Sequence, residues 1–156
     1  MMPARGNSIL IADDFAAFRG FVRSRLEENG FQNVAEASDG VEAAAKAAHL
    51  HPDVVLLDVA MPNLDGMKAA AQIRAVSAES KILFLSLYND HDIVQSVLSD
   101  GAMGYICKSE VNRELLPAIE AALEGKTFVG AVLHRARLWS DVPFKFSQMT
   151  GGYLEV

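Results

Sequence analysis

The strongest constraint on the fold of this chain is the way its apolar residues alternate between two periods along residues 1–124. Five short runs of β-branched and aliphatic residues show no polar alternation, which predicts strands covered on both faces. These strands are residues 8–12, 33–37, 54–57, 82–85 and 104–106. Segments of helical period follow them, at residues 15–29, 40–50, 66–76, 92–99 and 112–123. Strands that alternate with helices of this length predict an α/β fold, a doubly wound five-stranded parallel sheet with right-handed crossovers.

The charge divides the chain into two parts. Residues 1–124 hold 10 Lys+Arg and 18 Asp+Glu, a net charge of −8, whereas residues 125–156 hold 4 and 2, a net charge of +2. We therefore predict a flexible leader over residues 1–7, one domain over 8–124 and a C-terminal extension over 125–156. The acidity of the domain disfavours sequence-independent binding to nucleic acid, which depends on Lys and Arg.

The extension is too short for a DNA-binding domain, because a helix-turn-helix module needs about three helices and roughly 60 residues. Residues 129–139 could form an amphipathic helix that packs on the domain or on a second copy of the chain. A partly ordered end without a partner is the alternative. We expect no direct binding of nucleic acid by this chain.

The cysteine content and the lack of long apolar segments indicate a cytoplasmic protein. The one cysteine, Cys107, excludes an intramolecular disulfide, and the four histidines show no zinc-site spacing with it. No segment approaches the roughly 18 consecutive apolar residues of a membrane span, and the N-terminus lacks a signal-peptide pattern. We expect no membrane association, and we expect Cys107 to be a small core residue.

Polar residues follow four of the predicted strands at their carboxyl ends. Asp13 and Asp14 follow the first strand, Asp58 the third, Ser86 the fourth and Lys108 the fifth. In open parallel sheets the ligand site lies beyond these ends. Clustered carboxylates need a compensating cation, and Mg²⁺ prefers oxygen ligands together with a phosphate. An ammonium and a hydroxyl beside them predict a site that stabilises a phosphoryl group on one carboxylate.

Four sequence motifs, in order and each at a strand end, carry a family resemblance. They are ILIADD at 9–14, LDVAMPNLDG at 57–66, LS at 85–86 and GAMGYICK at 101–108. Together they resemble the receiver domain of two-component response regulators, and the pattern is similar to receivers that precede helix-turn-helix output domains. The resemblance covers residues 7–124. It implies a CheY-like, flavodoxin-like (βα)5 fold with strand order 2-1-3-4-5.

The resemblance also implies a role for each site residue. Asp58 would be the phosphoacceptor, and Mg²⁺ would be bound by Asp13, Asp14, Asp58 and the backbone carbonyl of Ala60. Lys108 and Ser86 would bind the phosphoryl group. Ser86 and Tyr105 would form the switch that changes the surface of the fourth helix, fifth strand and fifth helix. The phosphoryl donor would be a histidine kinase or a phosphotransfer protein, and the output a downstream protein partner or a homodimer.

Each role has a structural alternative. Asp14 could be only a helix N-cap, Asp58 a turn residue, Ser86 a cap, Lys108 a solvated lysine and Tyr105 a packing residue. The chain as a whole could be a dimerising interaction module that works without phosphorylation, or the receiver part of a truncated DNA-binding transcriptional regulator. We do not expect an enzyme, beyond catalysis of the chain's own phosphorylation and dephosphorylation.

Overall fold

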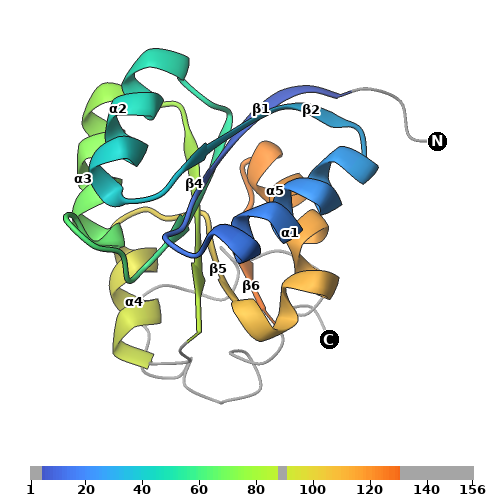
Figure 1. Cartoon of the computed structure of the whole chain (residues 1–156). Helices are drawn as coiled ribbons and strands as arrows, with labels where there is room; N and C mark the ends of the chain where they lie inside the picture. Colours follow the sequence, from blue (N-terminus) through green and yellow to red (C-terminus); the bar gives the residue numbers. More distant parts are fainter. Residues whose placement is uncertain (1–4, 88–90, 131–156) are drawn as a thin grey trace. The chain divides into compact units, whose positions relative to one another are not determined.

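The computed structural model describes residues 5–87 and 91–130, and these described residues divide between Ser80 and Lys81 into two compact units. The described residues contain six strands and five α-helices (Figure 1). None of these helices is both long enough and apolar enough to cross a membrane.

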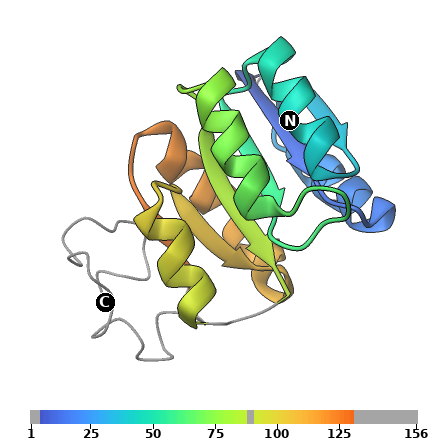
Figure 2. The same cartoon turned by 90° about the vertical axis from the view of Figure 1, so that its left-hand side faces the viewer.

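The first unit holds three parallel strands in the order β2-β1-β3. Its elements are β1 (Arg5–Ala12), α1 (Ala16–Glu28), β2 (Phe31–Ala37), α2 (Gly40–Leu50), β3 (Val54–Asp58) and α3 (Gly66–Val76). Figures 1 and 2 show α2 and α3 side by side on one face of these three strands, α2 over β1 and β2 and α3 against β3, with α1 on the other face. Leu10, Ile11 and Leu56 are fully buried between these layers, which explains why β1 and β3 have continuous apolar sequences.

The second unit also holds three parallel strands, in the order β4-β5-β6. Its elements are β4 (Lys81–Ser86), α4 (His91–Ser99), β5 (Gly104–Cys107), a 3-10 turn (Lys108–Glu110), α5 (Val111–Leu123) and β6 (Phe128–Val129). Helix α5 packs on all three strands and α4 packs on β5, on opposite sides of that strand (Figure 1).

Two segments outside the predicted domain belong to strands. The prediction of a flexible leader over residues 1–7 is wrong for residues 5–7, because the strand β1 begins at Arg5. The backbone N–H of Arg5 donates to the carbonyl of Gly30 at 2.7 Å, and its guanidinium lies 4.7 Å from the centroid of the Phe31 ring. Both contacts fix the first residues of β1 beside β2.

The second segment is β6, a sixth strand at residues 128–129 that pairs with Gly104 and Tyr105. It was not among the five predicted strands, and it lies in the part of the chain assigned to the extension. The helix predicted over residues 129–139 begins with Val129, which is in β6, and its residues from 131 onward lie outside the described part of the chain.

Candidate functional site

Three carboxylates gather at the carboxyl ends of β1 and β3. The two strands are parallel neighbours with Ala12 opposite Leu57, so Asp13 and Asp58 follow at the same level of the sheet. One oxygen from each of Asp13, Asp14 and Asp58 lies within 4.8 Å of the other two. Asp13 is 0% and Asp58 6% exposed, whereas Asp14 is open to solvent. We call these three residues the acid cluster.

The residues after β1 hold Asp13 in place. Its Oδ1 accepts a hydrogen bond from the backbone N–H of Phe15 at 2.8 Å, and its carbonyl accepts one from Nη1 of Arg19 at 2.6 Å. Helix α1 begins after Phe15 with no side chain capping it, so Asp14 does not act as the N-cap. The Asp14 carboxylate is therefore in the acid cluster without capping α1.

Arg19 also connects the acid cluster to β2. Its Nε donates to Glu36 at 2.9 Å, and Glu36 accepts a second bond from Nε of Arg23 at 2.6 Å. The bond from Arg23 is the main reason that the pKa of Glu36 lies below its ordinary value, and the bond from Arg19 adds to it. Glu36 therefore stays ionised and orients the guanidinium that holds the Asp13 carbonyl.

The loop after β3 folds back over Asp58. The backbone N–H of Ala60 donates to Oδ1 of Asp58 at 3.3 Å, and the N–H of Gly66 donates to the carbonyl of Val59 at 2.8 Å. A Cβ on Gly66 would overlap the carbonyl oxygen of Asp58, so only glycine allows α3 to start this close to β3. Asp58 is the last residue of β3 and its side chain stays within the site.

The donor set of the acid cluster fits Mg²⁺. All three side chains offer hard oxygen atoms, and a backbone carbonyl at Ala60 follows in the same loop. Mg²⁺ is usually bound through one or two carboxylates, with water and phosphate oxygens completing the octahedron. A divalent cation would also offset the repulsion among carboxylates of which two are buried.

The other predicted site residues lie in the second unit. Ser86 is the last residue of β4 and pairs in register with Cys107, and Lys108 follows Cys107 directly. Ser86 and Lys108 thus sit at the carboxyl ends of two neighbouring strands. Tyr105 pairs with Phe84 and is fully buried. The structure accordingly groups Asp13, Asp14 and Asp58 in one unit, and Ser86 with Lys108 in the other.

Cys107 is a buried core residue. Burial, with the charges of Glu114 and Glu110, raises the pKa of its thiol to about 11. The thiol is therefore protonated at neutral pH, which disfavours a nucleophilic or redox role.

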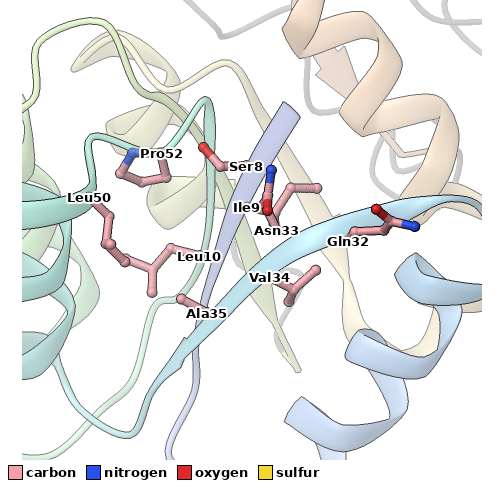
Figure 3. Close-up of a pocket in the computed structure, with 9 residues that line it drawn as sticks. All are labelled: Ser8, Ile9, Leu10, Gln32, Asn33, Val34, Ala35, Leu50 and Pro52. Carbon is pink, nitrogen blue, oxygen red and sulfur yellow. The ribbon is translucent and has the colours of Figure 1, made fainter. Parts of the chain in front are cut away.

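A pocket of about 420 Å³ lies elsewhere in the first unit, between β1, β2 and the end of α2 (Figure 3). Two of its polar lining residues are engaged elsewhere, because the Ser8 hydroxyl donates to Asp53 at 3.3 Å and Nδ2 of Asn33 donates to the carbonyl of Gly6 at 3.4 Å. None of the predicted site residues lines it.

Sequence reasoning missed three residues that hold the segments carrying the acid cluster. Arg19 holds the Asp13 carbonyl, and Asn63, in the loop that follows Asp58, donates to Asp39 at 2.7 Å. Asp39, directly before a glycine and a predicted helix, carries an N-cap signal that could have been used. Nothing in the local sequence indicates the partners of Arg19 and Asn63.

Comparison with known proteins identifies the family. The sequence model of the response regulator receiver domain family matches residues 9–120 of this chain. The oxygen regulatory protein NreC of Staphylococcus aureus (strain JH9) is 41% identical over 123 residues, which are 78% of this chain and 57% of that protein. The chain thus spans less than two thirds of the length of that curated relative.

Two solved structures show the same fold. A LuxR-family two-component response regulator from Aurantimonas sp. SI85-9A1 is 29% identical, with a TM-score of 0.78 over 84% of this chain and 94% of that one. The receiver domain of NarL from Mycobacterium tuberculosis is 31% identical, with a TM-score of 0.71 over 80% and 100%. These matches confirm the predicted α/β class with a parallel, flavodoxin-like sheet. The chain belongs to the response regulator receiver domain family.

Proposed function

We propose that the chain is a phosphorylatable receiver in a two-component or phosphorelay system, and that Asp58 is its phosphoacceptor. The observation that carries this proposal is the acid cluster, in which the buried Asp58 has two further carboxylates within 4.8 Å at a strand end. An ionised carboxylate can attack phosphorus without a general base, because it carries no proton to remove. Its reaction with an anionic phosphoryl group depends instead on neutralisation of the combined negative charge.

Asp13, Asp14, Asp58 and the carbonyl of Ala60 are the residues that would hold Mg²⁺. When bound, the ion would neutralise the carboxylates and the incoming phosphoryl group. The chain's own contribution is to hold these oxygens in place: Phe15 and Arg19 fix Asp13, and the N–H of Ala60 fixes the Asp58 carboxylate.

The proposed reaction is a single phosphoryl transfer from a histidine kinase or a phosphotransfer protein. An Oδ of Asp58 forms a bond to phosphorus while the bond from phosphorus to the donor's imidazole nitrogen breaks, which leaves an acyl phosphate and a free imidazole. The Lys108 ammonium and the Ser86 hydroxyl, from neighbouring strand ends, bind oxygens of the transferred group. The chain catalyses its own phosphorylation and dephosphorylation and turns over no metabolite.

The proposed output is a change at the surface formed by α4, β5 and α5. Tyr105 lies on β5 and is fully buried here, next to Phe84 of β4. We propose that the bond between Ser86 and the phosphoryl group favours this inward position of Tyr105, which alters the surface presented to a downstream protein or to a second copy of the chain.

The decisive experiment compares wild type with Asp58→Asn in the presence of Mg²⁺ and a small phosphodonor, and separately with beryllofluoride. Intact-mass analysis should show one added phosphoryl group on wild type and none on Asp58→Asn. The matched control is Asp100→Asn, an exposed carboxylate outside the acid cluster, which should behave like wild type.

A wild-type chain without mass gain and without a Mg²⁺-dependent spectral change would overturn the proposal. If such a chain still dimerised, the result would support an interaction module that works without phosphorylation.

A further inference from the structure

The loop between β3 and α3 lies directly against the first turn of α2. A Cβ on Gly40 would overlap the carbonyl oxygen and the side chain of Leu64, so the two backbones are in contact at this point. Beside this contact, Nδ2 of Asn63 donates to Oδ2 of Asp39 at 2.7 Å. The segment that follows Asp58 is thus attached to a helix that is remote from it in sequence.

Asp39 uses its two carboxylate oxygens for different purposes. Oδ1 accepts from the backbone N–H of Glu42 at 2.7 Å and caps α2, which leaves Oδ2 for Asn63. The bond from the Glu42 N–H lowers the pKa of Asp39 most, and the bond from Asn63 lowers it further. Because the cap fixes the Asp39 side chain, its second oxygen offers Asn63 a rigid acceptor.

Asn63 holds the loop in a conformation that few residues accept. Its φ is 69°, in the left-handed region where asparagine is favoured over most residues with a side chain. Asn63 is the central residue of a tight three-residue turn, in which the N–H of Leu64 donates to the carbonyl of Pro62 at 2.7 Å. At the base of the loop, Gly66 donates to Val59. The loop is therefore fixed at its base and at its far side, and Ala60 lies between these points.

We propose that Asp39 and Asn63 form a positioning pair, which sets the carbonyl of Ala60 and the approach to Asp58 by fixing the loop of residues 59–65. This inference rests on the proposed function, because Ala60 is a proposed Mg²⁺ ligand. Neither residue of the pair touches the metal or the phosphoryl group. Their effect passes through the loop backbone to the binding of Mg²⁺ and to the rate of phosphorylation.

Asn63→Gly is the first variant to test. Glycine accepts the left-handed conformation but removes the amide, so the loop loses its attachment to Asp39 without a change in charge. The affinity for Mg²⁺ alone, measured by calorimetry, should fall roughly 3- to 10-fold, the loss expected for one hydrogen bond of ordinary net strength at a solvent-exposed site. The rate of phosphorylation by a small phosphodonor at subsaturating Mg²⁺ should fall with it. Asp39→Ser, which keeps the N-cap but is too short to reach Asn63, should have the same effect on Mg²⁺ binding while α2 stays capped.

An exchange of the two residues gives the sharper test. In Asn63→Asp two carboxylates face each other, and we expect weaker Mg²⁺ binding although the added negative charge by itself would attract the cation. In the double variant Asp39→Asn with Asn63→Asp, the amide of residue 39 can donate to the carboxylate of residue 63 while its oxygen still caps α2. Mg²⁺ affinity should return to within about twofold of wild type, at the same net charge.

The outcomes separate the two proposals. If wild type binds Mg²⁺ and is phosphorylated but Asn63→Gly does both equally well, the positioning pair is wrong and the proposed function stands. Tighter Mg²⁺ binding by Asn63→Asp, or no recovery in the exchanged variant, would also overturn the pair. If wild type neither binds Mg²⁺ nor takes up phosphoryl, the proposed function itself fails.

Discussion

Arg19 and Asp13 are joined by a hydrogen bond of 2.6 Å from the guanidinium Nη1 to the backbone carbonyl, one residue beyond the end of β1. The same guanidinium donates from Nε to Glu36 at 2.9 Å and is 17% exposed. One side chain of α1 therefore links the strand end that carries the acid cluster to the neighbouring strand β2. The link fixes the backbone of Asp13, the buried carboxylate of the cluster at the end of β1.

Removing this link should destabilise the protein. Arg19→Ala takes a donor from the carbonyl of the buried Asp13 and one of two donors from Glu36, so we expect a loss of about 1–3 kcal/mol in the free energy of unfolding. Urea denaturation monitored by circular dichroism measures it. The control is Lys126→Ala, whose side chain is 53% exposed and pairs with the exposed Glu124, and its loss should stay under about 0.5 kcal/mol. Equal losses for the two variants would show that the Arg19 bonds contribute nothing specific.

Local signals were sufficient to predict α2 and α3. The predicted bounds, 40–50 and 66–76, agree with the structure because Asp39 and Asp65 cap the two helices and glycine follows each cap. The apolar period of residues 15–29 predicts the first helix but does not locate its buried face. Phe15 and Phe21 are 64% and 43% exposed, because the inward face of α1 is formed by Val22 and Leu26.

The acid cluster followed from the sequence because parallel strands bring their carboxyl ends to one edge. The contacts that hold the acid cluster in place could not be predicted from the sequence. Asp39 and Asn63 are 24 residues apart, and their bond depends on the packing of α2 against α3. The strand β6 has two residues, too few to show any period. Both features are consequences of tertiary contacts and have no local pattern.

Acid should weaken the start of α2 through Glu42. A hydrogen bond from the Ser38 N–H, followed by the Lys46 ammonium, lowers the pKa of Glu42 from 4.5 to about 2. A carboxyl with a lowered pKa in the folded state contributes stability above its unfolded pKa, and this contribution is lost as the pH falls from about 4.5 to about 2. Because the side chain is 39% exposed, we expect no more than about 1 kcal/mol. Urea midpoints across this range should fall less steeply for Glu42→Gln, and parallel curves would contradict the assignment.

Two glycines should respond to alanine in opposite directions. Gly20 is an exposed residue of α1 with no atom within 4 Å of an added Cβ, so Gly20→Ala should stabilise the protein by roughly 0.5–1 kcal/mol. Gly66→Ala would place a Cβ against the carbonyl of Asp58, so it should destabilise the protein by about 1–3 kcal/mol and weaken Mg²⁺ binding. Thermal melts and Mg²⁺ titration of the two variants measure the contrast. Destabilisation by both would show that the space beside Gly20 is filled.

Cys107 should be inert in the folded protein. With its pKa raised to about 11 from 9.0, its thiolate population near pH 8 is roughly 100-fold lower than that of an exposed thiol, and burial adds a steric block. A chromogenic disulfide reagent should react at least about 100-fold more slowly with the native protein than with the urea-unfolded protein. Since the chain has one cysteine, the whole signal belongs to it. Fast labelling of the native state would mean that the end of β5 opens readily.

Asp58→Asn should make the protein more stable without Mg²⁺ and less responsive to it. Two carboxylate charges within 4.8 Å of each other repel by about 3.5 kcal/mol or more at an effective dielectric constant of 20, and solvent at Asp14 reduces this, so we expect a gain of about 1 kcal/mol in EDTA. Asparagine can still accept the bond from the Ala60 N–H. Adding Mg²⁺ at about 100 times its Kd should stabilise wild type by about 2.7 kcal/mol and the variant by much less. Wild type should then have the larger free energy of unfolding of the two. Asp100→Asn, outside the acid cluster, should follow wild type in both conditions. Urea denaturation with EDTA and with Mg²⁺ is the measurement, and a variant that is less stable than wild type in EDTA would show that the repulsion is already compensated within the protein.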